Sequence, residues 1–308
     1  MDKKQPDKHS EVNFRDWFGF ILLRLSCTKL ISIFPVRFFS IVGGFIGYCI
    51  FHFNKGYRKS ILDNLQIAFG DKIDHKKPKE ICLQNIRHIV KGFVELVYFP
   101  QFSEKRRKKL FTIEGREYLD YALSLKKGVI GITGHIGNFV IMGAGLRLEG
   151  YPINYLIRPL REKRIETFVE DLREKAGARG ILTEPPDECV KEAIRALRNN
   201  DFLLIPIDQS DRKGGVYTKF FNRKVATPIG PLVFAQRCGS PILPIFVVRK
   251  KGDHHKIIIK RPMEIKKTGD FQSIVSDYSE KLTRIIEDYI HKYPTQWEWS
   301  YSRWDEDC

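Results

Sequence analysis

The chain has 308 residues, which is enough for one large domain or two. Lys and Arg number 53 against 37 acidic residues, and the formal net charge of +16 favours anionic partners: nucleic acid, acidic lipid headgroups or an acidic carrier protein. The six cysteines are scattered, with no C-x-x-C pair and no His–Cys ligand spacing, which argues against a disulfide framework or a zinc site and for a reducing compartment.

Residues 1–16 form a polar N-terminus of mixed charge, unlike a secretory signal. Two apolar patches follow, Trp17–Leu23 and Phe38–Phe53, and the second runs 16 residues without a formal charge. A helix needs about 20 apolar residues to span a bilayer. We therefore predict a membrane-associated helical segment over residues 17–55, which either spans the membrane or lies in its plane. A buried helix is the alternative.

Residues 56–110 are predicted to form a helical subdomain, because apolar side chains recur there at a rough helical period. Lys55, Arg58 and Lys59 would hold this subdomain on the cytoplasmic side of a membrane. The run Lys105–Lys109 is a compact basic cluster, which is either a solvated face or a surface that attracts anionic headgroups.

From residue 111 to 308 the pattern changes to short apolar runs separated by charged, helix-like segments. The apolar runs are Val129–Thr133, Ile153–Ile157, Phe202–Ile207 and Ile242–Val248, and the helix-like segments include Glu162–Lys175 and Asp187–Asn199. This alternation is typical of a parallel sheet covered by helices. The predicted fold class is therefore α/β, a mostly parallel central sheet flanked by helices, with an N-terminal membrane-associated helix.

A polar residue follows each of the four predicted strands: His135, Arg158, Asp208 and Arg249. In a parallel sheet these residues would gather at the carboxyl edge, where such folds bind ligands. An imidazole, a carboxylate and two guanidinium groups at one edge indicate a site, in which Arg249 is a candidate for substrate binding. The alternative is that Arg158 and Asp208 form a structural ion pair.

His135 lies in a Gly-His-x-Gly-Asn turn between an apolar run and a following helix. A histidine in this position can take a proton from a hydroxyl as a general base. The backbone N–H groups of the turn at Gly137 and Asn138 could bind an oxyanion or a phosphate. Arg158 could hold an acceptor phosphate, with Asp208 fixing the orientation of its guanidinium. The alternative for His135 is a turn histidine whose hydrogen bonds are satisfied locally.

The segment Gly134–Val140 resembles the acyl-transfer motif of the bacterial lipid A acyltransferases, within the lysophospholipid acyltransferase superfamily. Further blocks resemble the same family in the same order. They are Asn64-Leu65 with Ala68-Phe69, Gly92–Leu96, Ile113–Gly115, Arg158-Pro159, Asp208-Gln209, Gly215-Val216 with Phe220-Phe221, Thr227–Pro231, Pro294–Trp299 and Arg303-Trp304. The resemblance thus extends over residues 30–304.

One position departs from the family motif. The motif has an acid five positions after the histidine, where this chain has Val140, which cannot accept a hydrogen bond from the imidazole. Asp208 or a backbone carbonyl could hold the ring instead. If the geometry of the family holds, restoring an acid by Val140→Glu would raise turnover.

The resemblance implies an acyltransferase at the cytoplasmic face of the inner membrane, with residues 111–308 as the α/β acyltransferase domain. It would move a fatty acyl chain from acyl carrier protein or coenzyme A to a hydroxyl of a glycolipid, such as a lipid A precursor. His135 would be the base, and Arg158 and Asp208 further site residues. No cofactor and no metal are expected.

Direct transfer is expected, because the chain has no Gly-x-Ser-x-Gly nucleophile elbow. The alternative is a catalytically inactive relative that binds lipid or a partner enzyme through the same groove. Nucleic acid is not an expected partner, because no binding module is recognisable. Trp297, Trp299 and Trp304 form either an aromatic belt at the membrane interface or packing within the domain.

Overall fold

The predicted polar N-terminus (1–16), the first apolar patch (Trp17–Leu23) and most of the predicted helical segment Glu162–Lys175 lie outside the residues that the structure describes. The computed structural model describes residues 34–70, 76–159, 179–212, 214–251, 254–265 and 269–304, together with Thr167, Glu170 and Glu174.

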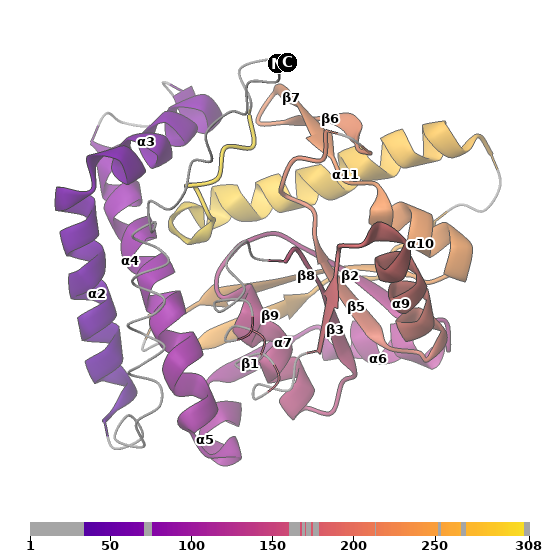
Figure 1. The fold of residues 1–308 in the computed structure, drawn as a ribbon, viewed down its shortest axis with the longest axis horizontal. Helices are drawn as coiled ribbons and strands as arrows, with labels where there is room; N and C mark the ends of the chain where they lie inside the picture. Colours follow the sequence, from indigo (N-terminus) through magenta and orange to yellow (C-terminus); the bar gives the residue numbers. More distant parts are fainter. Residues whose placement is uncertain are drawn as a thin grey trace, which may run out of the picture.

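The described chain begins with a layer of helices. They are α2 (Val36–Phe53), α3 (Lys55–Phe69), α4 (Lys77–Tyr98), the short 3-10 helix η3 (Phe99–Gln101) and α5 (Glu104–Lys108). Helices α2 and α4 lie side by side (Figure 1). Their contact is close at Gly47, where a Cβ atom would lie 2.6 Å from the Cα of Arg87 in α4. Glycine therefore lets the two helix backbones approach each other.

A seven-stranded sheet forms the centre of the molecule, in the order β1-β9-β8-β2-β5-β3-β4. Its strands are β1 (Phe111–Glu114), β2 (Val129–Thr133), β3 (Ile153–Ile157), β4 (Arg179–Leu182), β5 (Phe202–Pro206), β8 (Ile242–Arg249) and β9 (His255–Ile259). Among these strands, every pair except β8–β9 is parallel, which confirms the prediction of a mostly parallel sheet. Strands β6 (Val216–Phe220) and β7 (Arg223–Thr227) form a separate antiparallel hairpin.

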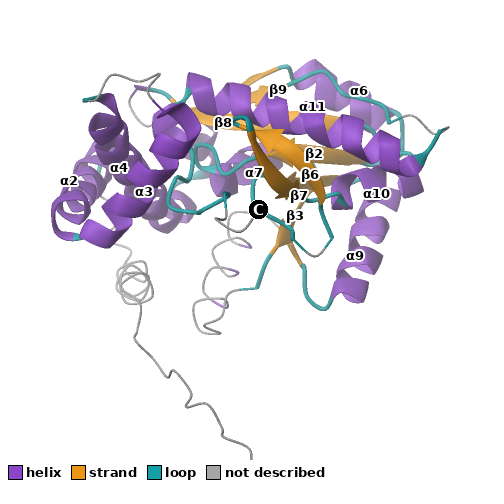
Figure 2. Ribbon diagram, turned by 90° about the horizontal axis from the view of Figure 1, so that it is seen from above, coloured by secondary structure: helices purple, strands orange, loops and turns teal. Residues whose placement is uncertain are grey.

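Helices cover both faces of the sheet, which also confirms the predicted α/β class (Figures 1 and 2). Side chains alternate along a strand, so each strand can feed two cores. In β2, Val129 packs with the core beneath α6 (Arg116–Ser124) and α7 (Phe139–Leu148). Its neighbour Ile130 packs with the core beneath α9 (Pro186–Arg198), α10 (Gly230–Cys238) and α11 (Phe271–Lys292).

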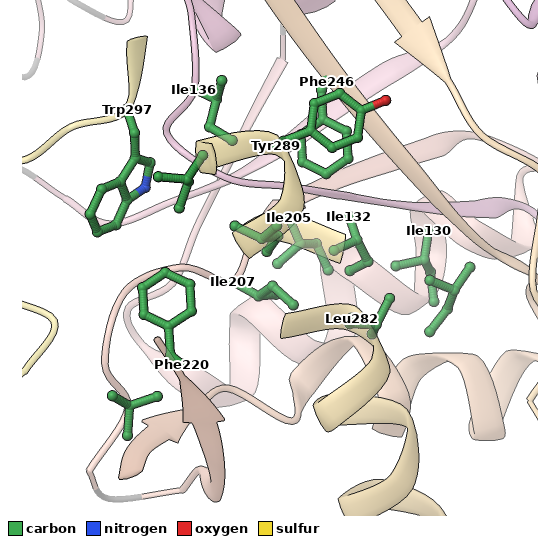
Figure 3. Close-up of a cluster of buried hydrophobic side chains, with 14 of the residues drawn as sticks. Ile130, Ile132, Ile136, Ile205, Ile207, Phe220, Phe246, Leu282, Tyr289 and Trp297 are labelled. Carbon is green, nitrogen blue, oxygen red and sulfur yellow. The ribbon is translucent and has the colours of Figure 1, made fainter. Parts of the chain in front are cut away.

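Figure 3 shows the core on the α11 side, where Leu282 and Tyr289 of α11 meet the isoleucines of β2 and β5. The ring of Tyr289 stacks on Phe246 of β8, with 3.8 Å between the ring centroids. Trp297 and Ile136 lie at the edge of the same core. This core therefore continues up to the loop that follows β2.

The predicted membrane helix is only partly recovered. A helix is present at α2, but none of the described helices is long and apolar enough to cross a bilayer. The 18 residues of α2 would rise about 27 Å, slightly less than the ~30 Å hydrocarbon core of a bilayer. The side of α2 that faces α4 is also built partly from glycines rather than large apolar residues. The structure therefore does not support a spanning helix among the described residues.

Candidate active site

His135 lies on the loop between β2 and α7, as the sequence pattern predicts. The buried strand β2 ends at Thr133, and α7 begins at Phe139. Asn138 caps this helix, since its side-chain oxygen accepts a hydrogen bond from the Ile141 N–H. The imidazole therefore stands on a short loop at the carboxyl edge of the sheet, before the helix starts.

Asp208 supplies the carboxylate that contacts His135. Its Oδ1 lies 2.7 Å from Nδ1 of the imidazole. Its Oδ2 accepts two more hydrogen bonds, each of 2.7 Å, from the backbone N–H of His135 and from the indole N–H of Trp297. The Asp208 side chain is 2% exposed, whereas that of His135 is 20% exposed. The acid is thus held beneath the ring, and the ring itself is accessible.

The two partners shift each other's pKa. Burial alone would lower the pKa of His135, but attraction to the Asp208 carboxylate and the hydrogen bond between them outweigh it and raise the pKa above its ordinary value. Burial alone would raise the pKa of Asp208, but the charge of His135 and the donated hydrogen bonds lower it to about 2. Asp208 is therefore ionised at neutral pH and fixes the proton of the imidazole on Nδ1, which leaves Nε2 free to act as a base.

Val140 carries no carboxylate for this ring. It belongs to the first turn of α7 and lines the pocket into which His135 opens. Of the two partners proposed for the imidazole, Asp208 or a backbone carbonyl, the structure shows Asp208, which lies on the loop after β5 and contacts Nδ1.

The pocket has a volume of about 580 Å³ and lies at the carboxyl ends of β2, β3 and β5. Its wall next to His135 is apolar and includes Phe139, Val140 and Tyr155. Polar side chains also line it, namely Arg158, Thr183, Gln209, Ser210 and Asp211. A second depression of about 620 Å³ lies beside β4 and α9 and is lined mainly by glutamates, but it contains none of the predicted site residues.

Arg158 is exposed on the pocket wall, where the sequence analysis places it. The alternative of a structural ion pair between Arg158 and Asp208 is not found in the described part of the chain, because Asp208 is bonded to His135 and Trp297 instead. For the same reason, Asp208 does not orient the guanidinium of Arg158. Gln209 follows Asp208, and its amide nitrogen lies 3.4 Å from Nε2 of His135.

The predicted role of the Gly137 N–H as a substrate-binding donor is not supported, whereas that of the Asn138 backbone N–H stays a prediction. The N–H of Gly137 donates to the carbonyl of Gln296 at 2.8 Å. Gly137 has φ +65, and a Cβ there would lie 2.2 Å from the carbonyl oxygen of Val247, so this turn packs directly on β8. The Asn138 side chain is buried and donates to Gly92 and Glu95. Gly137 and the Asn138 side chain therefore fix the shape of the His135 loop through contacts with β8, α4 and Gln296.

Arg249 is likewise not at the pocket. Extending the pairing of Ile132 with Pro244 puts Arg249 level with Gly137, two residues beyond His135. There its guanidinium forms a two-pronged ion pair with the buried carboxylate of Glu95 on α4. The prediction that Arg249 binds substrate assumed that β8 and β2 end at the same level. Strand β8 extends further, so Arg249 lies behind the His135 loop.

Residues 294–304, here called the closing segment, were missed as part of the site. Ile136 forms an isolated antiparallel bridge with Trp297, and the carbonyl of His135 accepts from the Glu298 N–H at 3.1 Å. Trp297, Trp299 and Trp304 are all buried and pack on one another. These contacts exclude a membrane belt for the three tryptophans and show packing within the domain. The signal in the sequence was the tryptophan-rich end itself.

No group of three or more His, Cys, Asp or Glu side chains suited to a metal ion occurs within the described ranges. Around this one pocket the structure places an imidazole, a buried carboxylate, an arginine and an amide.

Comparisons with known proteins identify the family. Residues 1–306 match a family model described as bacterial lipid A biosynthesis acyltransferase. The chain is also similar to the phosphatidylinositol mannoside acyltransferase of Mycobacterium tuberculosis, in the strains ATCC 25618 / H37Rv and CDC 1551 / Oshkosh. It is 26% identical to each over 136 residues, which is 43% of this chain and 42% of the relative. Because the family match spans almost the whole sequence, the chain belongs to the bacterial lipid A biosynthesis acyltransferase family.

Proposed function

We propose that the protein transfers a fatty acyl chain from an acyl thioester, carried by acyl carrier protein or coenzyme A, to a hydroxyl of a glycolipid. The acceptor is a lipid A precursor or a similar lipid. The observation that carries this proposal is the His135–Asp208 pair at the wall of a pocket that has apolar and polar sides. Family membership sets the type of reaction, and the pair supplies a base for it.

The proposed reaction is a direct acyl transfer. Nε2 of His135 takes the proton of the acceptor hydroxyl while the hydroxyl oxygen attacks the thioester carbonyl carbon. The resulting tetrahedral intermediate collapses, the C–S bond breaks, and the thiolate takes the proton from the imidazolium. The products are an ester and a free thiol. Asp208 stabilises the imidazolium throughout, because its carboxylate stays ionised beneath the ring.

Two pocket residues are proposed to bind the reactants. The Gly137 N–H is already bonded to Gln296, and the amide nitrogen of Gln209 lies 3.4 Å from Nε2 of His135. We assign it to the developing oxyanion of the thioester carbonyl. Arg158 is assigned to a phosphate of the acceptor, because a guanidinium binds phosphate with two parallel hydrogen bonds. The name of the mycobacterial relatives, phosphatidylinositol mannoside acyltransferase, supports a phosphate-containing glycolipid acceptor.

The proposed location is the cytoplasmic face of the inner membrane. Large apolar side chains are exposed along one side of α2, at Phe38, Ile41, Phe45 and Tyr48. Their spacing of three and four residues puts them on one helical face. An apolar face of this kind suits a helix that lies in the plane of the bilayer rather than one that crosses it.

The test is an acyl-transfer assay on purified membranes that contain the wild-type protein or the His135→Ala variant. The wild type should acylate a glycolipid, and the variant should lose at least about a thousandfold in rate. Lipidomics of a strain that lacks the gene should show loss of the same acylated lipid and identify the acceptor. Equal lipid profiles for wild type and variant would instead support the inactive, lipid-binding relative.

A further inference from the structure

A buried cluster of charged and polar side chains lies behind the loop that carries His135. It consists of Glu95 and His88 on α4, Arg249 at the end of β8, His255 at the start of β9, and Asn138. None of these side chains lines the pocket. The mechanism above does not use the cluster, so its presence needs its own explanation.

Glu95 is the centre of this cluster. Its Oε1 contacts Nη1 of Arg249 and lies 3.1 Å from Nε2 of His255. Its Oε2 accepts from Nη2 of Arg249 and from Nδ2 of Asn138, each at 2.9 Å. Both carboxylate oxygens are therefore fully engaged. The guanidinium of Arg249 and the hydrogen bonds from His255 and Asn138 compensate the cost of burying the Glu95 carboxylate.

Asn138 joins Glu95 to the catalytic loop. Its amide nitrogen is held by Glu95 and by the carbonyl of Gly92, and its amide oxygen caps the first turn of α7. Asn138 is three residues from His135 on one side, and its neighbours Phe139 and Val140 line the pocket on the other. The position of a single amide thus determines where the loop ends and where the helix begins.

A second connection reaches the same loop from Arg249. The side chain of Gln296 bonds to both the N–H and the carbonyl of Arg249, at 2.8 and 3.0 Å. The backbone carbonyl of Gln296 accepts from the N–H of Gly137. Glu95 therefore holds Asn138 by a direct hydrogen bond to its side chain. Arg249 is connected to Gly137 through Gln296 of the closing segment.

We propose that Glu95 is a positioning residue for acyl transfer, acting through Asn138 to hold the His135 loop and the first turn of α7 in their reactive arrangement. This inference rests on the proposed function for its catalytic consequence. Stability alone does not explain the cluster, because a buried ion pair contributes little net stability compared with well-packed apolar side chains. Catalysis, in contrast, is sensitive to displacements of about 1 Å.

The experiment is a double-mutant cycle between Glu95 and Asn138. The variants are Glu95→Gln, Asn138→Ser and the double variant, measured for kcat and KM at a temperature where each is folded. Serine can still cap α7 but is too short to reach Glu95. Each single variant should lower kcat about 10- to 100-fold with KM within about twofold, and the double variant should be no worse than the worse single variant. Losses that multiply, or a kcat within about twofold of wild type for Glu95→Gln, would overturn the proposal.

The matched control is Asn154→Ser. Asn154 is also buried and donates to a carboxylate, that of Asp201 at 2.9 Å, but this pair lies at the amino ends of β3 and β5, away from the pocket. Its loss removes the same kind of hydrogen bond and should leave kcat within about twofold of wild type.

A second readout does not depend on activity. Hydrogen exchange of the amides of residues 134–141 should become about tenfold faster in Glu95→Gln, while the amides of β2 and β5 keep their protection. Unchanged exchange in residues 134–141 would overturn the positioning role. If the wild type transfers no acyl group, the proposed function fails, and the exchange measurement still decides whether Glu95 holds the loop.

Discussion

The contact between His135 and Asp208 follows from strand register. Thr133 pairs with Pro206 in the parallel β2–β5 ladder, so the residue two positions further on each strand, His135 and Asp208, stands at the same level. Strand β3 is in register with β5 as well, which brings Arg158 close to that level. The imidazole is therefore contacted by a carboxylate that is distant in the sequence, whereas the family motif has its acid five positions after the histidine.

Replacing Asp208 by Asn should reduce activity and move its pH dependence. His135 must be neutral to accept a proton, and Asp208 raises its pKa, so we expect the acid limb of the kcat/KM profile of the wild type above the ordinary value for histidine. Asp208→Asn removes that attraction, so the limb should move to lower pH. The rate should also fall by at least about a thousandfold, because the tautomer is no longer fixed.

The control for this substitution is Asp201→Asn, at the opposite end of β5, where the carboxylate bonds to Asn154 rather than to the imidazole. It should leave both the rate and the acid limb in place. If the limb of Asp208→Asn stayed where it is in the wild type, Asp208 would not be the group that sets the pKa of His135.

The Val140→Glu substitution now has the opposite expected outcome to the one that the family motif suggests. Nδ1 of His135 is already bonded to Asp208, and Val140 forms part of the apolar pocket wall. A carboxylate placed there gains no partner from the ring and is costly to bury. We expect kcat/KM to fall about tenfold or more, whereas Val140→Ile should stay within about threefold. A higher kcat/KM for Val140→Glu would show that position 140 can still reach the imidazole.

At the level of secondary structure elements, four strands of the sheet (β2, β3, β5 and β8) were predicted, whereas β1, β4 and β9 and the contacts between elements were not. The apolar runs at 129–133 and 153–157 coincide with β2 and β3, because each is a short, largely buried stretch bounded by glycine, proline or arginine. The length of β8 relative to β2 could not be read from either strand alone, and this misplaced Arg249. The hydrogen bond between Asn138 and Glu95 could not be predicted from the sequence, because the two residues are 43 positions apart and come together only through the packing of α4 against the start of α7.

The close contact between α2 and α4 gives a prediction at the same scale. Gly47→Ala and Gly56→Ala both gain helix propensity, which is worth up to about 1 kcal/mol in an exposed helix. At Gly56 the added methyl group meets only the Asn54 side chain, at 3.9 Å, so this variant should be as stable as wild type or more so. At Gly47 the methyl group would overlap Arg87, so α2 must move away, and the free energy of unfolding should fall by about 1–3 kcal/mol.

Denaturant unfolding of the two variants beside wild type measures this difference. Equal free energies of unfolding for Gly47→Ala and Gly56→Ala would show that α2 is not packed on α4 as closely as the structure has it.

At the level of the whole molecule, the exposed face of α2 is the surface that we propose meets the bilayer. Ile41 is 71% exposed and Phe45 is 66% exposed. The double variant Ile41→Lys/Phe45→Lys should therefore bind vesicles of phosphatidylethanolamine and phosphatidylglycerol at least about tenfold more weakly than wild type in a flotation assay. Tyr121→Lys, at an exposed aromatic residue on α6, should float as wild type does. Equal flotation of the double variant would exclude this face as the attachment surface.

The closing segment has a consequence for the order in which the protein matures. It is synthesised after every strand of the sheet, yet it supplies the indole bond to Asp208 and two backbone bonds to the His135 loop. A nascent chain whose sheet has already folded thus still lacks the last partners of its reactive pair. A chain that stalls before residues 294–304 leave the ribosome and dock would therefore lack the indole partner of Asp208 and both backbone contacts to the His135 loop.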